Sequence, residues 1–167
     1  MKSILFRYYY WIAFIACVLV ISLKFCEMPD FDWRLVITIL GGVLGFVYFV
    51  QKQKLDEMHL FKELFAEFNE RYNKLNEDLN QILRGDDNQK LTTEDINRLY
   101  DYFNLCGEEY FFHDQGYIPS KVWKAWCNGM KYFLNNKRIR ECWLEEEKTN
   151  SYYGLTLSII LKSASDR

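Results

Sequence analysis

Residues 4–23 read ILFRYYYWIAFIACVLVISL, a run of twenty residues whose only charged side chain is Arg7. About 20 apolar residues in a helix cover the hydrocarbon core of a bilayer. Four aromatic side chains, Tyr8 to Trp11, form a belt of the kind found at membrane interfaces. A second apolar stretch, Trp33 to Val50, follows closely. The two stretches predict an N-terminal transmembrane helical hairpin within residues 1–51.

A cleaved signal peptide is the alternative interpretation of the first stretch, because Lys2 and Arg7 precede an apolar run. No small-x-small pattern precedes a suitable cleavage point, and Leu23-Lys24-Phe25-Cys26 lacks the small residues of a lipoprotein site. The second apolar stretch also favours an anchor. We therefore expect the first stretch to stay in the chain as a membrane span.

Charges beside the two spans predict their orientation. Lys2 and Arg7 lie at the start, Lys52 and Lys54 follow the second span, and the connection between the spans carries acids. Positive residues favour the cytoplasmic side, so both termini are expected in the cytoplasm of an inner-membrane, multi-pass protein. Gly41 and Gly45 form a Gly-x-x-x-Gly motif, which suits close helix packing either within the hairpin or between subunits.

Residues 52–167 are expected to form a cytoplasmic helical domain, so the predicted fold class is all-α. Its clearest feature is an apolar seam that steps by 3 and 4 residues: Met58, Phe61, Phe65, Phe68, Tyr72, Leu75, Leu79 and Ile82. This spacing is typical of a bundle helix that faces a core, or of a coiled coil between chains. If the seam pairs between chains, its bulky aromatic residues favour more than two subunits.

Two further helices are predicted after the turn at residues 85–88. Thr92 and Asp95 resemble a capping arrangement, and Ile96, Leu99, Phe103, Cys106 and Tyr110 repeat the helical spacing. Pro119 suits the first turn of a third helix, with Val122, Trp126, Met130 and Phe133 on its apolar side. The last segment, residues 151–167, fits either a docked helix or a strand.

Positive charge is concentrated between Gln115 and Arg140, where six Lys or Arg occur without any Asp or Glu, although residues 51–167 hold 17 basic and 20 acidic side chains. In the third predicted helix Lys121, Lys124, Asn128, Lys131 and Asn135 share one face. Fixed cations bind phosphate through charge-assisted hydrogen bonds, and aromatic rings stack on bases. The predicted ligand-binding residues are therefore Lys121, Lys124, Lys131, Arg138 and Arg140 for phosphate, and Trp123, Tyr132 and Asn136 for a base.

An ordinary solvated face, or one that touches anionic lipid headgroups, explains the same charges. In that alternative the chain is a structural or scaffolding membrane protein, and its seam recruits a helical partner. Binding to long duplex nucleic acid is disfavoured, because the remainder of the domain is acidic.

Catalytic motifs are absent from the sequence. It has no glycine-rich phosphate loop, no His-Glu-x-x-His and no Gly-x-Ser-x-Gly, and its two histidines lie on different predicted elements. The five cysteines include no Cys-x-x-Cys pair, so free cysteines in a reducing cytoplasm are expected instead of a disulfide framework or a zinc site. We expect no enzyme activity, no cofactor and no bound metal.

The hairpin, the helix LFKELFAEFNERYNKLNEDL (60–79), the cationic block WKAWCNGMKYFLNNKRIRECW (123–143) and the closing SYYGLTL (151–157) together resemble small two-span bacterial membrane proteins of antiphage defence. They are similar in particular to the membrane effectors of type III CRISPR systems that sense cyclic tetra-adenylate. The resemblance rests on architecture and implies a tetrameric cytoplasmic domain that binds the cyclic nucleotide and then disturbs the membrane. It assigns no binding residue.

Overall fold

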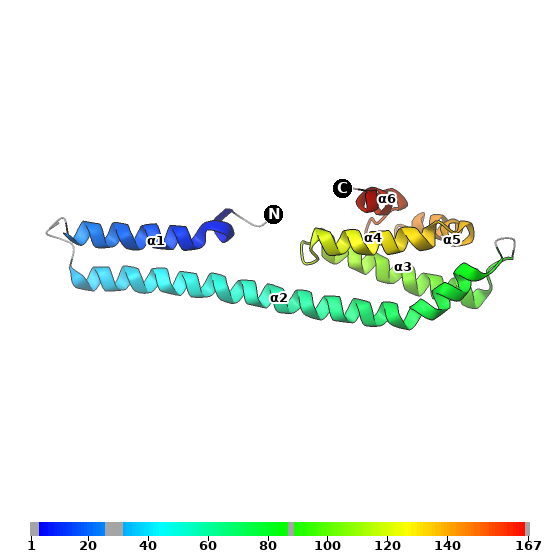
Figure 1. Ribbon diagram of the computed structural model, residues 1–167, viewed down its shortest axis with the longest axis horizontal. Helices are drawn as coiled ribbons and strands as arrows, with labels where there is room; N and C mark the ends of the chain where they lie inside the picture. The colour runs from blue at the N-terminus through cyan, green and yellow to red at the C-terminus, as the bar shows by residue number, and fades with distance from the viewer. Residues whose placement is uncertain (1–3, 26–31, 87–88, 166–167) are drawn as a thin grey trace. The chain divides into compact units, whose positions relative to one another are not determined.

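The computed structural model describes residues 4–25, 32–86 and 89–165, and every regular element in these ranges is a helix (Figure 1). The predicted all-α fold class is confirmed for them. The helices are α1 (Ile4–Phe25), α2 (Trp33–Arg84), α3 (Thr93–Asp114), α4 (Ser120–Leu134), α5 (Lys137–Glu147) and α6 (Leu157–Ser165). Lys2, two acids of the connection between the predicted spans, Glu27 and Asp30, and also Cys26 lie outside the described residues.

The chain divides into two compact units, Met1–His59 and Leu60–Arg167. From the sequence, the boundary was predicted eight residues earlier, between residues 51 and 52, because the composition changes from apolar to charged after Val50. Both positions lie inside α2, one continuous helix of 52 residues, so no helix end marks the boundary.

The first unit holds the apolar helices. By length and composition, α2 is the one helix in the described part of the chain that is suited to cross a membrane, while the apolar part of α1 there, Tyr8–Leu23, is shorter. Two polar contacts join the helices: the Gln51 amide donates to the Tyr10 hydroxyl at 2.9 Å, and the Lys54 ammonium lies 4.3 Å from the centre of the Tyr9 ring. The transmembrane hairpin itself stays a prediction.

The face with the Gly-x-x-x-Gly motif is open within the described residues. A Cβ atom built on Gly41, Gly42 or Gly45 would meet nothing within 4 Å. The close packing that this motif permits is therefore not made among the described residues.

The second unit has its own hydrophobic core, and most of the predicted seam of α2 lies in it. Phe68, Leu75, Leu79 and Ile82 are buried, whereas Phe65 is 40% exposed. The Phe68 ring contacts Trp126 of α4 edge-on and Phe112 of α3. This part of the seam therefore faces the core of its own chain, as the first of the two interpretations predicted.

Local sequence signals set the helix ends. Thr92 accepts a hydrogen bond from the Asp95 amide at 3.1 Å, and the Asp95 carboxylate accepts one from the Thr92 amide at 2.8 Å, so the predicted cap of α3 is confirmed. Pro119 is the N-cap of α4. The helix α3 continues to Asp114, so His113 lies in its last turn.

The closing segment forms a turn followed by α6, so the helical alternative is confirmed for residues 157–165. Tyr153 and Gly154 have positive φ angles of 55° and 85°, and they reverse the chain ahead of α6. The helix α6 packs on α4, and α4 also contacts α3 and α5 (Figure 1). The cationic helix α4 is thus covered on two sides.

Candidate ligand-binding surface

The exposed side of α4 carries a cationic stripe, which we define as Lys121, Lys124, Asn128 and Lys131. Successive residues of a helix turn by about 100°, so these four positions fall within about 80° of each other. They extend along about 15 Å of the helix axis. Lys121 is exposed, and Lys124 and Lys131 are partly exposed. The structure therefore brings these three predicted phosphate contacts onto one surface.

The two predicted aromatic base contacts on α4 have different surroundings. Tyr132 is 58% exposed and borders the cationic stripe, where its ring is accessible to a planar ligand. Trp123 is only 3% exposed. Its indole N–H donates to the Ser163 hydroxyl of α6 at 3.1 Å, and its ring stacks on His113 with centres 5.0 Å apart. Trp123 therefore belongs to the core in this structure, and it holds α6 and the end of α3 against α4.

The helix α4 ends at Leu134, and a separate helix, α5, begins at Lys137; the sequence analysis did not predict this additional helix. Asn136 is the N-cap of α5, and its side-chain oxygen accepts hydrogen bonds from the backbone amides of Arg138 at 3.0 Å and Ile139 at 3.2 Å. This cap already uses the oxygen that a base would contact. Asn-Asn after a helical apolar pattern is the signal that indicates the break, because Asn is a preferred N-cap residue.

Arg138 and Arg140 are not brought together. Both lie on α5, but two residues of helix place them about 200° apart, on opposite faces. Arg140 is exposed, whereas Arg138 is partly buried against the end of α2. Arg140 therefore remains accessible to a ligand, and Arg138 has a task within the fold.

Arg138 holds the C-terminal carbonyl groups of α2. Its Nη2 donates to Ile82 O at 2.5 Å and to Gly85 O at 3.0 Å, and its Nη1 donates to Gln89 O at 3.4 Å. The last carbonyls of a helix lack their usual partners within the helix. Ile82 O accepts one hydrogen bond from the Gly85 amide at 3.3 Å, and the guanidinium adds a second donor to Ile82 O and supplies one to Gly85 O. Arg138 thereby ties the first turn of α5 to the end of α2.

A groove of about 520 Å³ lies beside this guanidinium. It is lined by the segment that leads into α3, by the start of α3 and by one face of α5: Gln89, Lys90, Leu91, Ile96, Tyr100, Arg138, Glu141, Cys142 and Glu145. Of the eight predicted ligand-binding residues, Arg138 is the one that lines it. Its size falls within the range of small-molecule sites.

Glu109 is a buried carboxyl group that the sequence reading did not single out. It is 6% exposed, and burial raises its pKa to about 8, against the opposing effect of the Arg71 guanidinium. Its position three residues after the buried Cys106 was the signal that could have found it. A proton on this carboxyl at neutral pH suits its apolar surroundings.

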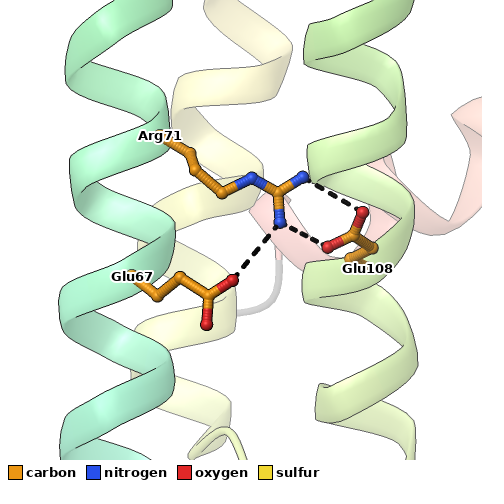
Figure 2. Close-up of polar contacts among 3 residues, drawn as sticks. All are labelled: Glu67, Arg71 and Glu108. Carbon is orange, nitrogen blue, oxygen red and sulfur yellow. Dashed lines mark hydrogen bonds and ion pairs between the residues drawn. The ribbon is translucent and has the colours of Figure 1, made fainter.

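Arg71 joins α2 to α3 close to this site. Figure 2 shows its guanidinium between two carboxylates, with both oxygens of Glu108 engaged and Glu67 farther away. The Arg71 Nη2 to Glu108 Oε1 distance is 3.0 Å, Nη1 also contacts Glu108, and Nη1 lies 3.8 Å from Glu67. The hydrogen bond with Glu108 raises the pKa of Arg71. This two-pronged pair fixes how α2 and α3 face each other.

The cysteines are distributed as small apolar side chains. Cys106 and Cys127 are buried and Cys142 is half-buried, and burial raises the thiol pKa of Cys127 to about 12 and that of Cys142 to about 11. Within residues 4–25, 32–86 and 89–165 no cluster of three or more His, Cys, Asp or Glu side chains is arranged to hold a metal ion. The thiols are therefore weak nucleophiles at neutral pH.

Comparison with known proteins found no matching family model, and neither the curated proteins nor the solved structures gave a significant match.

Proposed function

We propose that the chain is a membrane-anchored defence effector whose cytoplasmic bundle binds a cyclic oligonucleotide second messenger, cyclic tetra-adenylate, and then perturbs the inner membrane through its N-terminal helices. Both termini are cytoplasmic, the two apolar helices form a transmembrane hairpin, and four subunits assemble. The protein acts by binding and not by catalysis.

The continuity of α2 is the observation that carries this proposal. The same helix contributes the exposed apolar stretch from Trp33 and the buried core residues Phe68 and Leu79. A ligand that changes the packing of the bundle therefore also acts on the apolar first half of α2, because both belong to one helix. To shift a population from 1:99 to 99:1, a ligand must favour one arrangement by about 5.5 kcal/mol, which several phosphate contacts per subunit supply.

The cationic stripe supports an anionic ligand. Its lysines lie in a stretch of chain without acidic residues, and Tyr132 and Arg140 add an exposed ring and an exposed guanidinium nearby in sequence. Around a symmetric oligomer the stripe repeats in every subunit, which matches the repeated phosphates of a cyclic oligonucleotide.

Calorimetry on the full chain in lipid nanodiscs tests the proposal. The panel is cyclic tetra-adenylate, a larger cyclic oligoadenylate, a cyclic dinucleotide and linear tetra-adenylate. We expect tight binding of cyclic tetra-adenylate, and about a tenfold loss of affinity for each of Lys121→Gln and Lys131→Gln. Lys62→Gln is the matched control, because Lys62 is an exposed lysine of α2 outside the stripe.

Dye leakage from vesicles that hold the full chain tests the proposed effect on the membrane. We expect leakage when cyclic tetra-adenylate is bound and no leakage without it. If no nucleotide on the panel binds, and the chain instead shows salt-dependent affinity for anionic lipid, the proposal fails and the scaffolding alternative is favoured.

A further inference from the structure

The groove beside Arg138 has an unusual balance of charge. Its two acids are already paired with lysines of α5 and its C-cap: Glu141 with Lys137 at 3.9 Å, and Glu145 with Lys148 at 2.7 Å. Its two cations, Arg138 and Lys90, form no ion pair with any residue of the described ranges. Arg138 and Lys90 are therefore the charged groups of the groove that are available to an anion.

Arg138 keeps hydrogen-bonding capacity in this position. A guanidinium has five N–H groups, and those of Nη2 are both engaged with carbonyl oxygens. Nη1 makes one long bond, 3.4 Å to Gln89 O, so within the described residues one of its two N–H groups is left for an acceptor. An anionic oxygen is the acceptor that a guanidinium binds best.

The rest of the lining is apolar or aromatic. Leu91, Ile96 and Tyr100 form the wall from α3 and the segment before it, and Cys142 of α5 faces the same groove. All four are partly exposed, so the wall is accessible to a ligand. A planar, weakly polar ring system fits such a wall better than a free inorganic ion does.

We propose that this groove binds one nucleotide unit, with its phosphate on Arg138 and Lys90 and its base against Leu91, Ile96 and Tyr100. The site is separate from the cationic stripe of α4. The proposal takes from the proposed function only the chemical class of the ligand. Its geometry stands on the unpaired cations and the apolar wall.

The test uses the full chain in nanodiscs at pH 9, where a small fraction of the Cys142 thiol is ionised despite its raised pKa, and follows the slow alkylation of Cys142 by peptide mass spectrometry, with adenosine monophosphate, ribose 5-phosphate and inorganic phosphate as probes. We expect adenosine monophosphate to slow alkylation at about tenfold lower concentration than ribose 5-phosphate, because the base adds stacking contacts. Lys90→Gln should weaken this protection about tenfold, since it removes one charge-assisted contact. Lys62→Gln should leave it unchanged.

Lys90 is exposed, so its substitution tests the phosphate contact without disturbing the carbonyl contacts of Arg138. Equal protection by adenosine monophosphate and ribose 5-phosphate, or none by either, would overturn the proposal. Protection by adenosine monophosphate in a chain that does not bind cyclic tetra-adenylate supports the groove and rejects the proposed function. Binding of cyclic tetra-adenylate that depends on Lys121 but leaves Cys142 unprotected rejects the groove and keeps the proposed function.

Discussion

At the scale of single residues, the buried carboxyl of Glu109 makes stability depend on pH. Its folded pKa of about 8 lies above its value of 4.5 in an unfolded chain, so the folded protein holds a proton that the unfolded chain releases. The stabilisation is complete below the unfolded pKa and is lost as pH rises through about 8. We expect Glu109→Gln to match the natural chain at pH 4.5 and to be more stable by a few kcal/mol at pH 9.

Thermal unfolding in nanodiscs between pH 4.5 and 9 measures this difference. Glu63→Gln is the control, because Glu63 is an exposed carboxylate of α2 and is not among the groups that shift the Glu109 pKa. That substitution should leave the slope of the pH profile unchanged. Parallel profiles for Glu109→Gln and the natural chain would show that Glu109 keeps an ordinary pKa in the fold.

Gly85 and Arg138 form a second residue-scale pair. A Cβ atom on Gly85 would lie 2.8 Å from Arg138 Nη2, although the backbone there does not need a glycine for its φ angle. Gly85→Ala must therefore displace the guanidinium from Ile82 O and Gly85 O, at a cost of about 1 to 2 kcal/mol. Gly129→Ala is the control: its Cβ would be in open space within α4, so the change is expected to stabilise the helix by up to about 1 kcal/mol.

Denaturant unfolding of Gly85→Ala, Arg138→Ala and the double variant checks the mechanism. Because both single changes break the same contacts, the double variant should cost less than the sum of the two. Strictly additive costs would mean that the alanine methyl group acts through something other than Arg138.

At the scale of elements, the start of α5 depends on Asn136, whose side chain caps the helix. Asn136→Ala leaves the amides of Arg138 and Ile139 without their acceptor and should cost about 1 kcal/mol, whereas Asn136→Asp keeps an oxygen there and should cost little. Unfolding midpoints of the two variants measure this. A loss of stability as large for Asp as for Ala would contradict a capping role.

Helix spacing and capping signals were sufficient to predict α2, α3 and α4, because the 3 and 4 residue steps and the Thr92–Asp95 pair act locally. The orientation of α4 was predicted less well: Val122 and Trp126 were expected inside, whereas Trp123 and Cys127 are the more deeply buried residues. The reason is α6, which packs on α4 and places Ser163 opposite the Trp123 indole. The sequence of the last segment fitted a helix and a strand equally well, so this second packing partner could not be foreseen.

Candidate site residues were predictable as a class but not in their tasks. The segregation of charge in the sequence was enough to predict that the cationic stripe and Arg140 lie on accessible surface. Exposure of a lysine or arginine side chain can be predicted without knowing which helices pack together. The roles of three other residues, Arg138, Trp123 and Asn136, could not be predicted in this way, because they depend on a helix break or on groups far away in the sequence. Arg138, for example, donates to the carbonyl of Ile82, 56 residues earlier. The groove likewise combines the approach to α3 with α5, and no local pattern connects those two segments.

At the scale of the whole molecule, the apolar half of α2 is the part of the described chain that is suited by length and composition to cross a membrane. Leu40 and Leu44 lie near the middle of the stretch from Trp33 to Val50, and Leu44 is 68% exposed. A lysine at the centre of a transmembrane helix costs about 2.5 to 3.5 kcal/mol, so Leu40→Lys with Leu44→Lys removes most of the drive for insertion of this span. We expect the natural chain to stay with membranes after a carbonate wash, and the two-lysine variant to appear partly in the supernatant.

The matched control is Leu40→Phe with Leu44→Phe, which keeps both positions apolar and should stay in the pellet. Partial release of the two-lysine variant is expected because α1 carries an apolar stretch of its own, so the size of the retained fraction reports how far α1 anchors the chain alone. If the natural chain itself is released by carbonate, the apolar side chains exposed on α2 face another protein and not lipid, and the coupling of bundle to membrane through one continuous helix is refuted.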